Sequence, residues 1–154
     1  MSELLERIQK DIVTAMKARQ EMELSTLRML KAEIQKAQTE KGRSTELADE
    51  DVVALIQRLI KQRHESAEQF TAGGASDRAA EELREAAFLE TFLPEQLPDD
   101  ELDNMIEKAA AAVKATGPKD MGRVMGRIMN EVRGRAEGKR VKTRVQAYLQ
   151  SLVE

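Results

Sequence analysis

The 154-residue sequence contains no cysteine and no tryptophan, and it has only three prolines. Without cysteine the chain can form no disulfide, no thiolate metal site and no cysteine nucleophile. Aromatic residues make up 3% of the sequence, so aliphatic side chains, Met and Ala must form the interior. Three prolines and eight glycines are too few turn residues for a fold of many strands.

Long hydrophobic runs are missing as well. The first residues, MSELLERIQKDI, carry acidic side chains and lack the apolar region of a secretory signal. No apolar run approaches the ~20 residues that a membrane-spanning helix needs. We therefore expect a cytoplasmic protein with no membrane partner.

The residues that are abundant favour helices. Ala, Glu, Leu, Lys, Arg, Met and Gln, the strongest helix formers, dominate the sequence. Apolar residues recur at helical spacing in seven segments, at about 3–18, 21–41, 49–72, 76–93, 99–115, 118–132 and 139–153. The motif LPEQLPDD at 93–100 holds two prolines four residues apart and marks the clearest boundary. We predict an all-α fold of two helical lobes, an N-terminal four-helix lobe (1–96) and a C-terminal three-helix lobe (97–154).

The helical stripes predict which side chains are buried. The inward positions include Leu5, Ile8, Ile12 and Met16 in the first segment; Val52, Val53, Ile56, Leu59 and Ile60 in the third; Leu83, Ala87 and Phe88 in the fourth; and Val141, Val145, Leu149 and Leu152 in the last, with Tyr148 partly buried. The first two segments form either a tight hairpin or one kinked rod, because only a residue or two near Arg19 and Gln20 separates them.

The segment ends carry their own signals. Asp49 suits the N-cap of the third helix, Gly73-Gly74 suits its left-handed end, and residues 42–45 are a predicted loop. Before the sixth helix, Gly117 fits the N-cap and Pro118 the first helical position. The Asp120 carboxylate can then accept hydrogen bonds from free backbone N–H groups.

A self-contained active site is not visible in the sequence. The one histidine, His64, could share a metal with Glu68 one turn later, but no second His or Cys completes a ligand shell. A solvent-exposed or capping role for His64 is therefore favoured over a ligand or a catalyst. No serine has a glycine-rich setting, and the acid clusters stand mainly at helix starts, where they complement the helix dipole. We predict no catalytic residue, no metal and no cofactor.

Charge is distributed unevenly along the chain. Residues 1–97 hold 14 Lys/Arg and 19 Asp/Glu, a net charge of −5, and residues 98–118 hold 2 and 5, a net charge of −3. Residues 119–154 hold 9 and 4, a net charge of +5. Basic side chains at this density can bind phosphates, and the alternative is an ordinary solvated charged face. The candidate RNA-binding residues are Lys119, Arg123, Arg127, Arg133, Arg135, Lys139 and Arg140, with Lys142 and Arg144 nearby.

Two further patterns in this region have structural and functional alternatives. Met121, Met125 and Met129 form a stripe that suits core packing or, alternatively, an adaptable groove, and Gly122 and Gly126 beside it would let another helix approach closely. The run GRAEGK (134–139) suits a helix–helix turn or, alternatively, a basic loop whose backbone N–H groups bind phosphate.

Longer segments resemble a known family. LSTLRMLKAEIQKAQ (24–38), IKQRHESAEQF (60–70), LETFLPEQL (89–97), PKDMGRVMGRIM (118–129) and GRAEGKRV (134–141) are similar, in this order, to the YqeY family. The C-terminal lobe, from about Leu89, also resembles the tail domain of GatB, a component of the tRNA-dependent amidotransferase. The resemblance implies a two-lobe helical fold and, through the amidotransferase tail, an association with tRNA. It carries no catalytic residue to this chain.

The leading interpretation is a non-catalytic helical module that associates with tRNA or another structured RNA through its basic lobe. One alternative is an accessory component of a glutamine-dependent amidotransferase (a carbon–nitrogen ligase), which would bind the catalytic components of that enzyme. The other is a protein–protein interaction module in which the acidic N-terminal lobe binds a partner. No aromatic residues are interleaved with the basic ones, so RNA shape and backbone are the expected targets.

Overall fold

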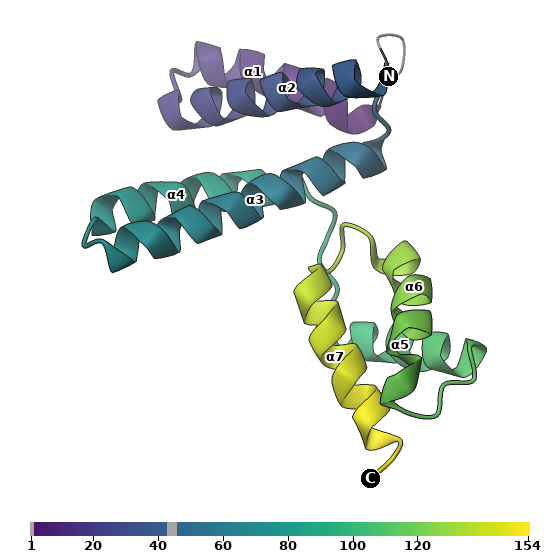
Figure 1. Ribbon diagram of the computed structural model, residues 1–154. Helices are drawn as coiled ribbons and strands as arrows, with labels where there is room; N and C mark the ends of the chain where they lie inside the picture. Colours follow the sequence, from purple (N-terminus) through teal and green to yellow (C-terminus); the bar gives the residue numbers. More distant parts are fainter. Residues whose placement is uncertain (1, 43–45) are drawn as a thin grey trace. The chain divides into compact units, whose positions relative to one another are not determined.

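The computed structural model describes residues 2–42 and 46–154, and its regular elements over these residues are all helical (Figure 1). The helices are α1 (Glu3–Lys17), α2 (Glu21–Lys41), α3 (Asp49–Ala72), α4 (Ser76–Glu90), α5 (Asp99–Ala112), α6 (Met121–Val132) and α7 (Gly138–Ser151), with a 3₁₀ turn, η1 (Pro118–Asp120), before α6. The all-α prediction is confirmed. None of the described helices is both long enough and apolar enough to span a membrane.

The chain forms two compact units, which meet in the sequence between Leu93 and Pro94. Gln96 and Leu97 belong structurally to the second unit. The Gln96 side-chain amide donates to the carbonyl of Gly134 at 2.9 Å, and the Leu97 N–H donates to the carbonyl of Arg135 at 2.8 Å. Leu97 is also buried in the second core.

The first unit consists of two helical hairpins, α1–α2 and α3–α4. Arg19 has a φ of 55° and turns the chain back after α1, so α1 and α2 lie side by side as a tight hairpin rather than a kinked rod (Figure 1). α3 ends before Gly74, whose φ of 81° is the left-handed conformation expected at this glycine pair. The predicted loop at 42–45 lies largely outside the described residues.

The core of the first unit corrects three predictions of burial. The five predicted positions of α3 are all buried. In α1, however, Met16 is 50% exposed and Ala15 is buried in its place. In α4, Leu83 is 46% exposed and Ala87 is exposed too, because α4 turns Ala79, Ala86 and Leu89 inward. The small alanines on this inner face let α4 pack closely along α3. The sequence prediction favoured the larger apolar side chains and therefore missed this face.

The start of α3 also differs from the expectation. Ala48 occupies the N-cap and Asp49 is the first helical residue. The Asp49 carboxylate accepts a hydrogen bond from the Leu4 backbone N–H at 3.3 Å. Asp49 therefore links the starts of α1 and α3.

The second unit packs α5, α6 and α7 around one aliphatic core. Its fully buried side chains come from all three helices and include Leu102, Ile106, Val124, Ile128, Val132, Val141, Val145 and Leu149. Tyr148 is partly buried, as predicted, whereas Leu152 is 41% exposed because it follows the last helical turn. The capping prediction before α6 is confirmed, since Asp120 accepts hydrogen bonds from the Thr116 and Gly117 N–H groups at 2.7 and 3.3 Å.

Candidate nucleic-acid interface

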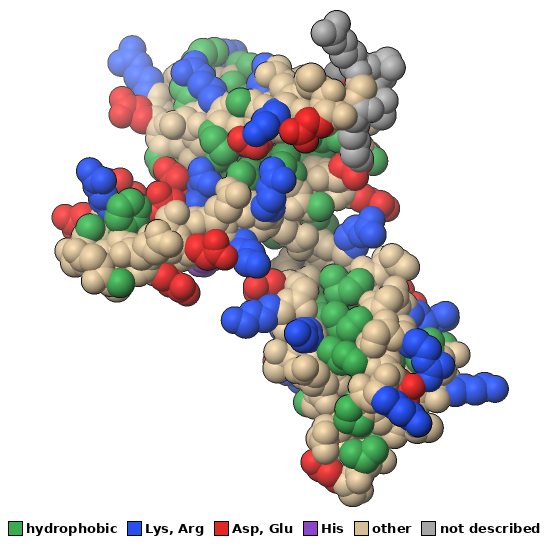
Figure 2. Space-filling model, viewed as in Figure 1, with side chains coloured by type: hydrophobic (Ala, Val, Ile, Leu, Met, Phe, Trp, Pro, Cys, Tyr) green, Lys and Arg blue, Asp and Glu red, His purple; other side chains and the backbone are tan. Residues whose placement is uncertain are grey.

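The predicted RNA-binding residues follow one continuous stretch of the second unit. Lys119 lies in η1, Arg123 and Arg127 lie on α6, Arg133 and Arg135 lie between α6 and α7, and Lys139 and Arg140 lie in the first turn of α7. Figure 2 shows Lys and Arg side chains over α6 and α7, with hydrophobic side chains between the two helices. The stretch is therefore helical except for the short α6–α7 turn.

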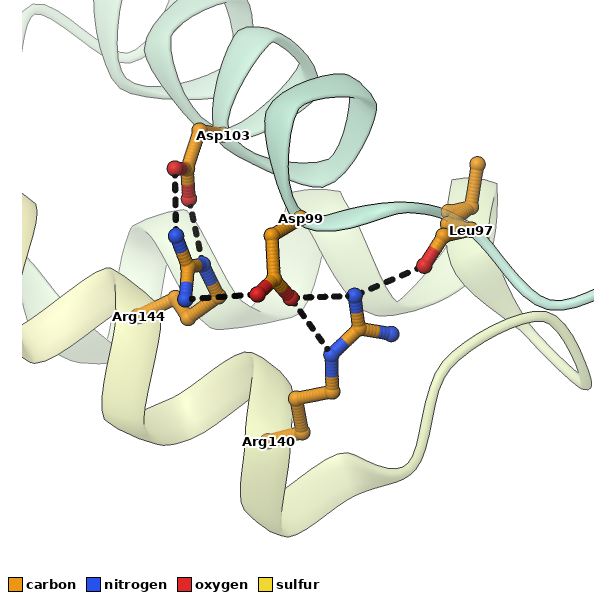
Figure 3. A network of polar contacts seen from close by, with 5 residues as sticks. All are labelled: Leu97, Asp99, Asp103, Arg140 and Arg144. Carbon is orange, nitrogen blue, oxygen red and sulfur yellow. Dashed lines mark hydrogen bonds and ion pairs between the residues drawn. The ribbon is translucent and has the colours of Figure 1, made fainter.

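Two arginines of α7 are bound to carboxylates of α5 (Figure 3). Arg144 makes a bidentate pair with Asp103, with two N–O distances of 2.6 Å, and lies 3.5 Å from Asp99. Arg140 donates to Asp99 at 2.6 Å and to the carbonyl of Leu97 at 2.7 Å. This network fastens α7 to the start of α5, so Arg140 has a structural partner in addition to its predicted role.

The ion pairs shift the ionisation of their members. The hydrogen bond from Arg144 lowers the pKa of Asp103, and the same bond raises the pKa of Arg144. Both groups therefore remain charged throughout the physiological range.

Arg123 also has partners inside the unit. Its guanidinium pairs with Asp120 and donates to the carbonyl of Val113 at 2.9 Å. Hydrogen bonds from the Thr116 N–H and from Arg123 lower the pKa of Asp120 to about 2. Asp120 is buried, and it organises the turn from which α6 begins. Arg123 thus neutralises Asp120, although its own side chain is 59% exposed.

The remaining candidates are more available. Lys119, Arg127, Arg135 and Lys139 are exposed, and none of them has a side-chain hydrogen bond or ion pair with the described residues. Lys142 on α7 shares both properties. Arg133 is exposed but interacts with another group. The structure thus divides the basic set into paired arginines and cations that are free to meet a phosphate.

The glycine turn between α6 and α7 is held by the segment before α5. Gly134 has a φ of 79°, and its carbonyl accepts the Gln96 amide described above. The Arg135 N–H donates to the carbonyl of Val132 at 2.8 Å. Because this N–H already has an acceptor, the geometry supports a helix–helix turn, with Arg135 offering its side chain to solvent.

The methionine stripe of α6 packs against the second core. Met121, Met125 and Met129 are partly buried there, in agreement with the packing interpretation. At Gly122 and Gly126 an added Cβ atom would meet no other atom within 4 Å. Within the described second unit, no helix therefore makes the close approach that these glycines suggested.

The structure also reveals a groove that no sequence pattern indicated. It lies between α5 and α7, has a volume of about 360 Å³, and is lined by Asp103, Ile106, Glu107, Thr143, Arg144, Ala147 and Tyr148. Its two walls are about 40 positions apart in the sequence, so only the packing of α5 against α7 brings them together. The local signals are the spacings of three or four residues within each wall, which put Asp103 and Glu107 on one face of α5 and Arg144 and Tyr148 on one face of α7.

His64 lies in the first unit, away from any cluster of ligands. It is exposed, as predicted, and its Nε2 atom is 3.8 Å from Glu90. Among the described residues, no three His, Asp or Glu side chains lie close enough together to hold a metal ion.

Comparison with known proteins places the chain in a family. A profile of the Yqey-like proteins matches residues 5–149. An uncharacterized protein of the fission yeast Schizosaccharomyces pombe is 34% identical over 88 residues, which cover 57% of this chain and 70% of the yeast protein. The profile spans both helical units and includes all the candidate RNA-binding residues. The chain therefore belongs to the YqeY family.

Proposed function

We propose that this protein is a non-catalytic helical module that binds tRNA or another structured RNA through its second unit. The observation that carries the proposal is a set of exposed cations along η1, α6, the α6–α7 turn and α7 whose side chains have no partner in the described part of the chain, namely Lys119, Arg127, Arg135, Lys139 and Lys142. The likeness of this region to the GatB tail supports tRNA as the ligand. The proposal includes a cytoplasmic location, where tRNA is found.

The arrangement of charge supports a phosphate ligand. The acidic side chains at the start of α5 are in part neutralised by α7, since Asp99 and Asp103 pair with Arg140 and Arg144. Asp120 is likewise neutralised by Arg123. Three carboxylates of the unit are therefore already compensated by arginines and compete less for the cations that face solvent.

The residue types indicate what part of the RNA is read. Lysine and arginine side chains on helices can follow a phosphate backbone, and phosphate contacts fix position without reading sequence. Helical RNA is bound mostly through its shape and backbone. We therefore expect α6 and the α6–α7 turn to bind structured RNA with an affinity that depends little on the RNA sequence.

The test is tRNA binding by fluorescence anisotropy across a salt series. The variant Arg127→Ala/Arg135→Ala/Lys139→Ala removes three free cations without breaking an ion pair of the described chain. If each cation contacts one phosphate, the slope of log K (the association constant) against log salt should be about 2–3 units less steep for the variant than for the wild type.

A matched control changes three exposed lysines of the first unit, Lys10→Ala/Lys36→Ala/Lys61→Ala, whose side chains also lack partners among the described residues. It should leave the slope unchanged. Equal effects of the two triple variants would show non-specific attraction and contradict the proposed surface. No tRNA binding at low salt would favour a protein partner, and co-purification with the catalytic components of an amidotransferase would then identify the accessory role.

A further inference from the structure

A row of residues without bulky side chains runs along the outer face of α6. Gly122, Gly126 and Asn130 follow one another at intervals of four positions, and all three are exposed. The Asn130 amide donates to the carbonyl of Gly126 at 3.3 Å, so it lies along the row. Glycine weakens the interior of a helix and is used where another backbone approaches closely. Within the second unit nothing makes that approach, since a Cβ atom on either glycine would have open space around it.

Apolar side chains border this row on the side of α7. Met125 and Met129 lie three positions after Gly122 and Gly126 and are only partly buried. The Cε atom of Met129 lies 3.9 Å from the position that a Cβ atom of Gly138 would take. The start of α7 is therefore next to this methionine. Figure 2 shows the hydrophobic side chains that reach the surface between the two helices.

Free cations border the same surface on α7. Positions 138, 142, 146, 149 and 153 are three or four residues apart and therefore share one side of this helix. Gly138 meets Met129 at one end of that side and Val153 meets Gly117 at the other, so the side faces α6 and includes Lys142. Lys142 and Lys139, one turn earlier, are exposed and have no partner in the described chain.

Acidic side chains are nearly absent from these two helices. Glu131 is the one acidic residue within α6 and α7. It comes two positions after Met129, which places it about 200° around α6, on the opposite side from the methionines. The surface between the helices therefore combines apolar side chains, two open glycines and lysines without a carboxylate beside them.

We propose that this surface, made by Gly122, Met125, Gly126, Met129 and Lys142, binds an acidic amphipathic helix of a protein partner. The glycines admit the backbone of such a helix, its apolar stripe covers the adaptable methionines, and its Asp or Glu side chains meet the lysines. RNA brings no apolar stripe to these methionines, and a second copy of the surface would bring like charges together. The inference goes beyond the proposed function. Because the helix uses Lys139 and Lys142, it excludes RNA from them.

A pair of designed peptides tests the chemistry. The first is a labelled helix of about 18 residues, five turns, with Leu and Ala along one stripe and Glu on both sides of it. The second has Lys in place of every Glu. Anisotropy with the full-length protein should show that the acidic peptide binds at least roughly tenfold more tightly. The methyl NMR signals of Met125 and Met129 should shift on binding, whereas that of the exposed Met16 in the first unit should not.

Two variants with matched controls locate the peptide. Gly126→Leu fills the open space on α6 and should weaken the acidic peptide by roughly tenfold, whereas Asn104→Leu, at an exposed position of α5, should have no effect. Lys142→Glu should weaken the acidic peptide by roughly fivefold, and Lys108→Glu, the same change of charge on α5, should weaken it less.

The outcomes separate this inference from the proposed function. No saturable binding of the acidic peptide up to roughly 1 mM, equal binding of the two peptides, or wild-type binding by Gly126→Leu would overturn it. A dimer of the free protein that Gly126→Leu dissociates would assign the surface to a second copy instead. Gly126→Leu keeps every cation, so its salt slope for tRNA should match that of the wild type. Failure of tRNA binding would overturn the proposed function alone, because the peptide assay contains no RNA.

Discussion

Two leucines of α4 differ sharply in burial although they lie on the same helix. Leu89 is fully buried in the core of the first unit, whereas Leu83 is 46% exposed. Leu83→Ala and Leu89→Ala make the same chemical change in the same helix. Because the chemical change is the same, the difference between their stabilities reports mainly the difference in packing.

The expected magnitudes follow from burial. Leu89→Ala removes buried methyl groups and leaves a cavity, which should cost about 3 kcal/mol of unfolding free energy. Leu83→Ala loses only partial burial and leaves no closed cavity, so it should cost less than about 1 kcal/mol. With an m-value of about 2 kcal/mol per molar urea, the unfolding midpoint should fall by about 1.5 M for Leu89→Ala and by less than about 0.5 M for Leu83→Ala.

The midpoints can be followed by far-UV circular dichroism and by the NMR intensities of α3 and α4 amides, which report the first unit directly. Equal losses for the two variants, or a larger loss for Leu83→Ala, would refute the register in which α4 packs on α3.

Two further predictions concern the second unit. Gly126→Ala should raise the unfolding free energy by roughly 0.5–1 kcal/mol, because the glycine is in the middle of α6 and a methyl group there has open space. Urea unfolding measures this free energy. A loss of stability would mean that another group packs against this glycine. Asp120 has a pKa lowered to about 2 from its usual 3.8, so its stabilising effect is fully present above about pH 4 and is lost as the pH falls toward 2. Asp120→Asn should therefore be less stable than wild type at pH 7, and the difference between their urea midpoints should close between pH 4 and pH 2. A difference that stays constant in acid would show that the charge of Asp120 does not contribute to stability.

Much of the fold could be predicted from the sequence because its signals are local. The proline pair at 94 and 98 and the glycines mark several helix ends. The aliphatic stripe of α3 faces inward as its spacing indicates. The failures concern tertiary contacts. Leu83 and Met16 have helical spacing, but the close packing allowed by Ala79, Ala86 and Ala15 places them toward solvent.

The candidate interface was predicted only in outline. Basic density along the chain identified the region, but sequence could not show that Arg140 pairs with Asp99, since the two are 41 positions apart. The groove at Glu107 and Tyr148 was missed for the same reason, because its walls come from separate helices. Ion pairs between distant segments decide which cations are free, and only the folded chain reveals them.

The central claim is that RNA covers the free cations along η1, α6, the α6–α7 turn and α7, and lysine footprinting tests it most directly. Full-length protein is acetylated with and without tRNA at low salt, and modification of each lysine is measured by mass spectrometry. The account predicts protection of Lys119, Lys139 and Lys142, with Lys10, Lys36 and Lys61 of the first unit modified equally in both samples. Protection confined to the first unit, or uniform across both units, would contradict it.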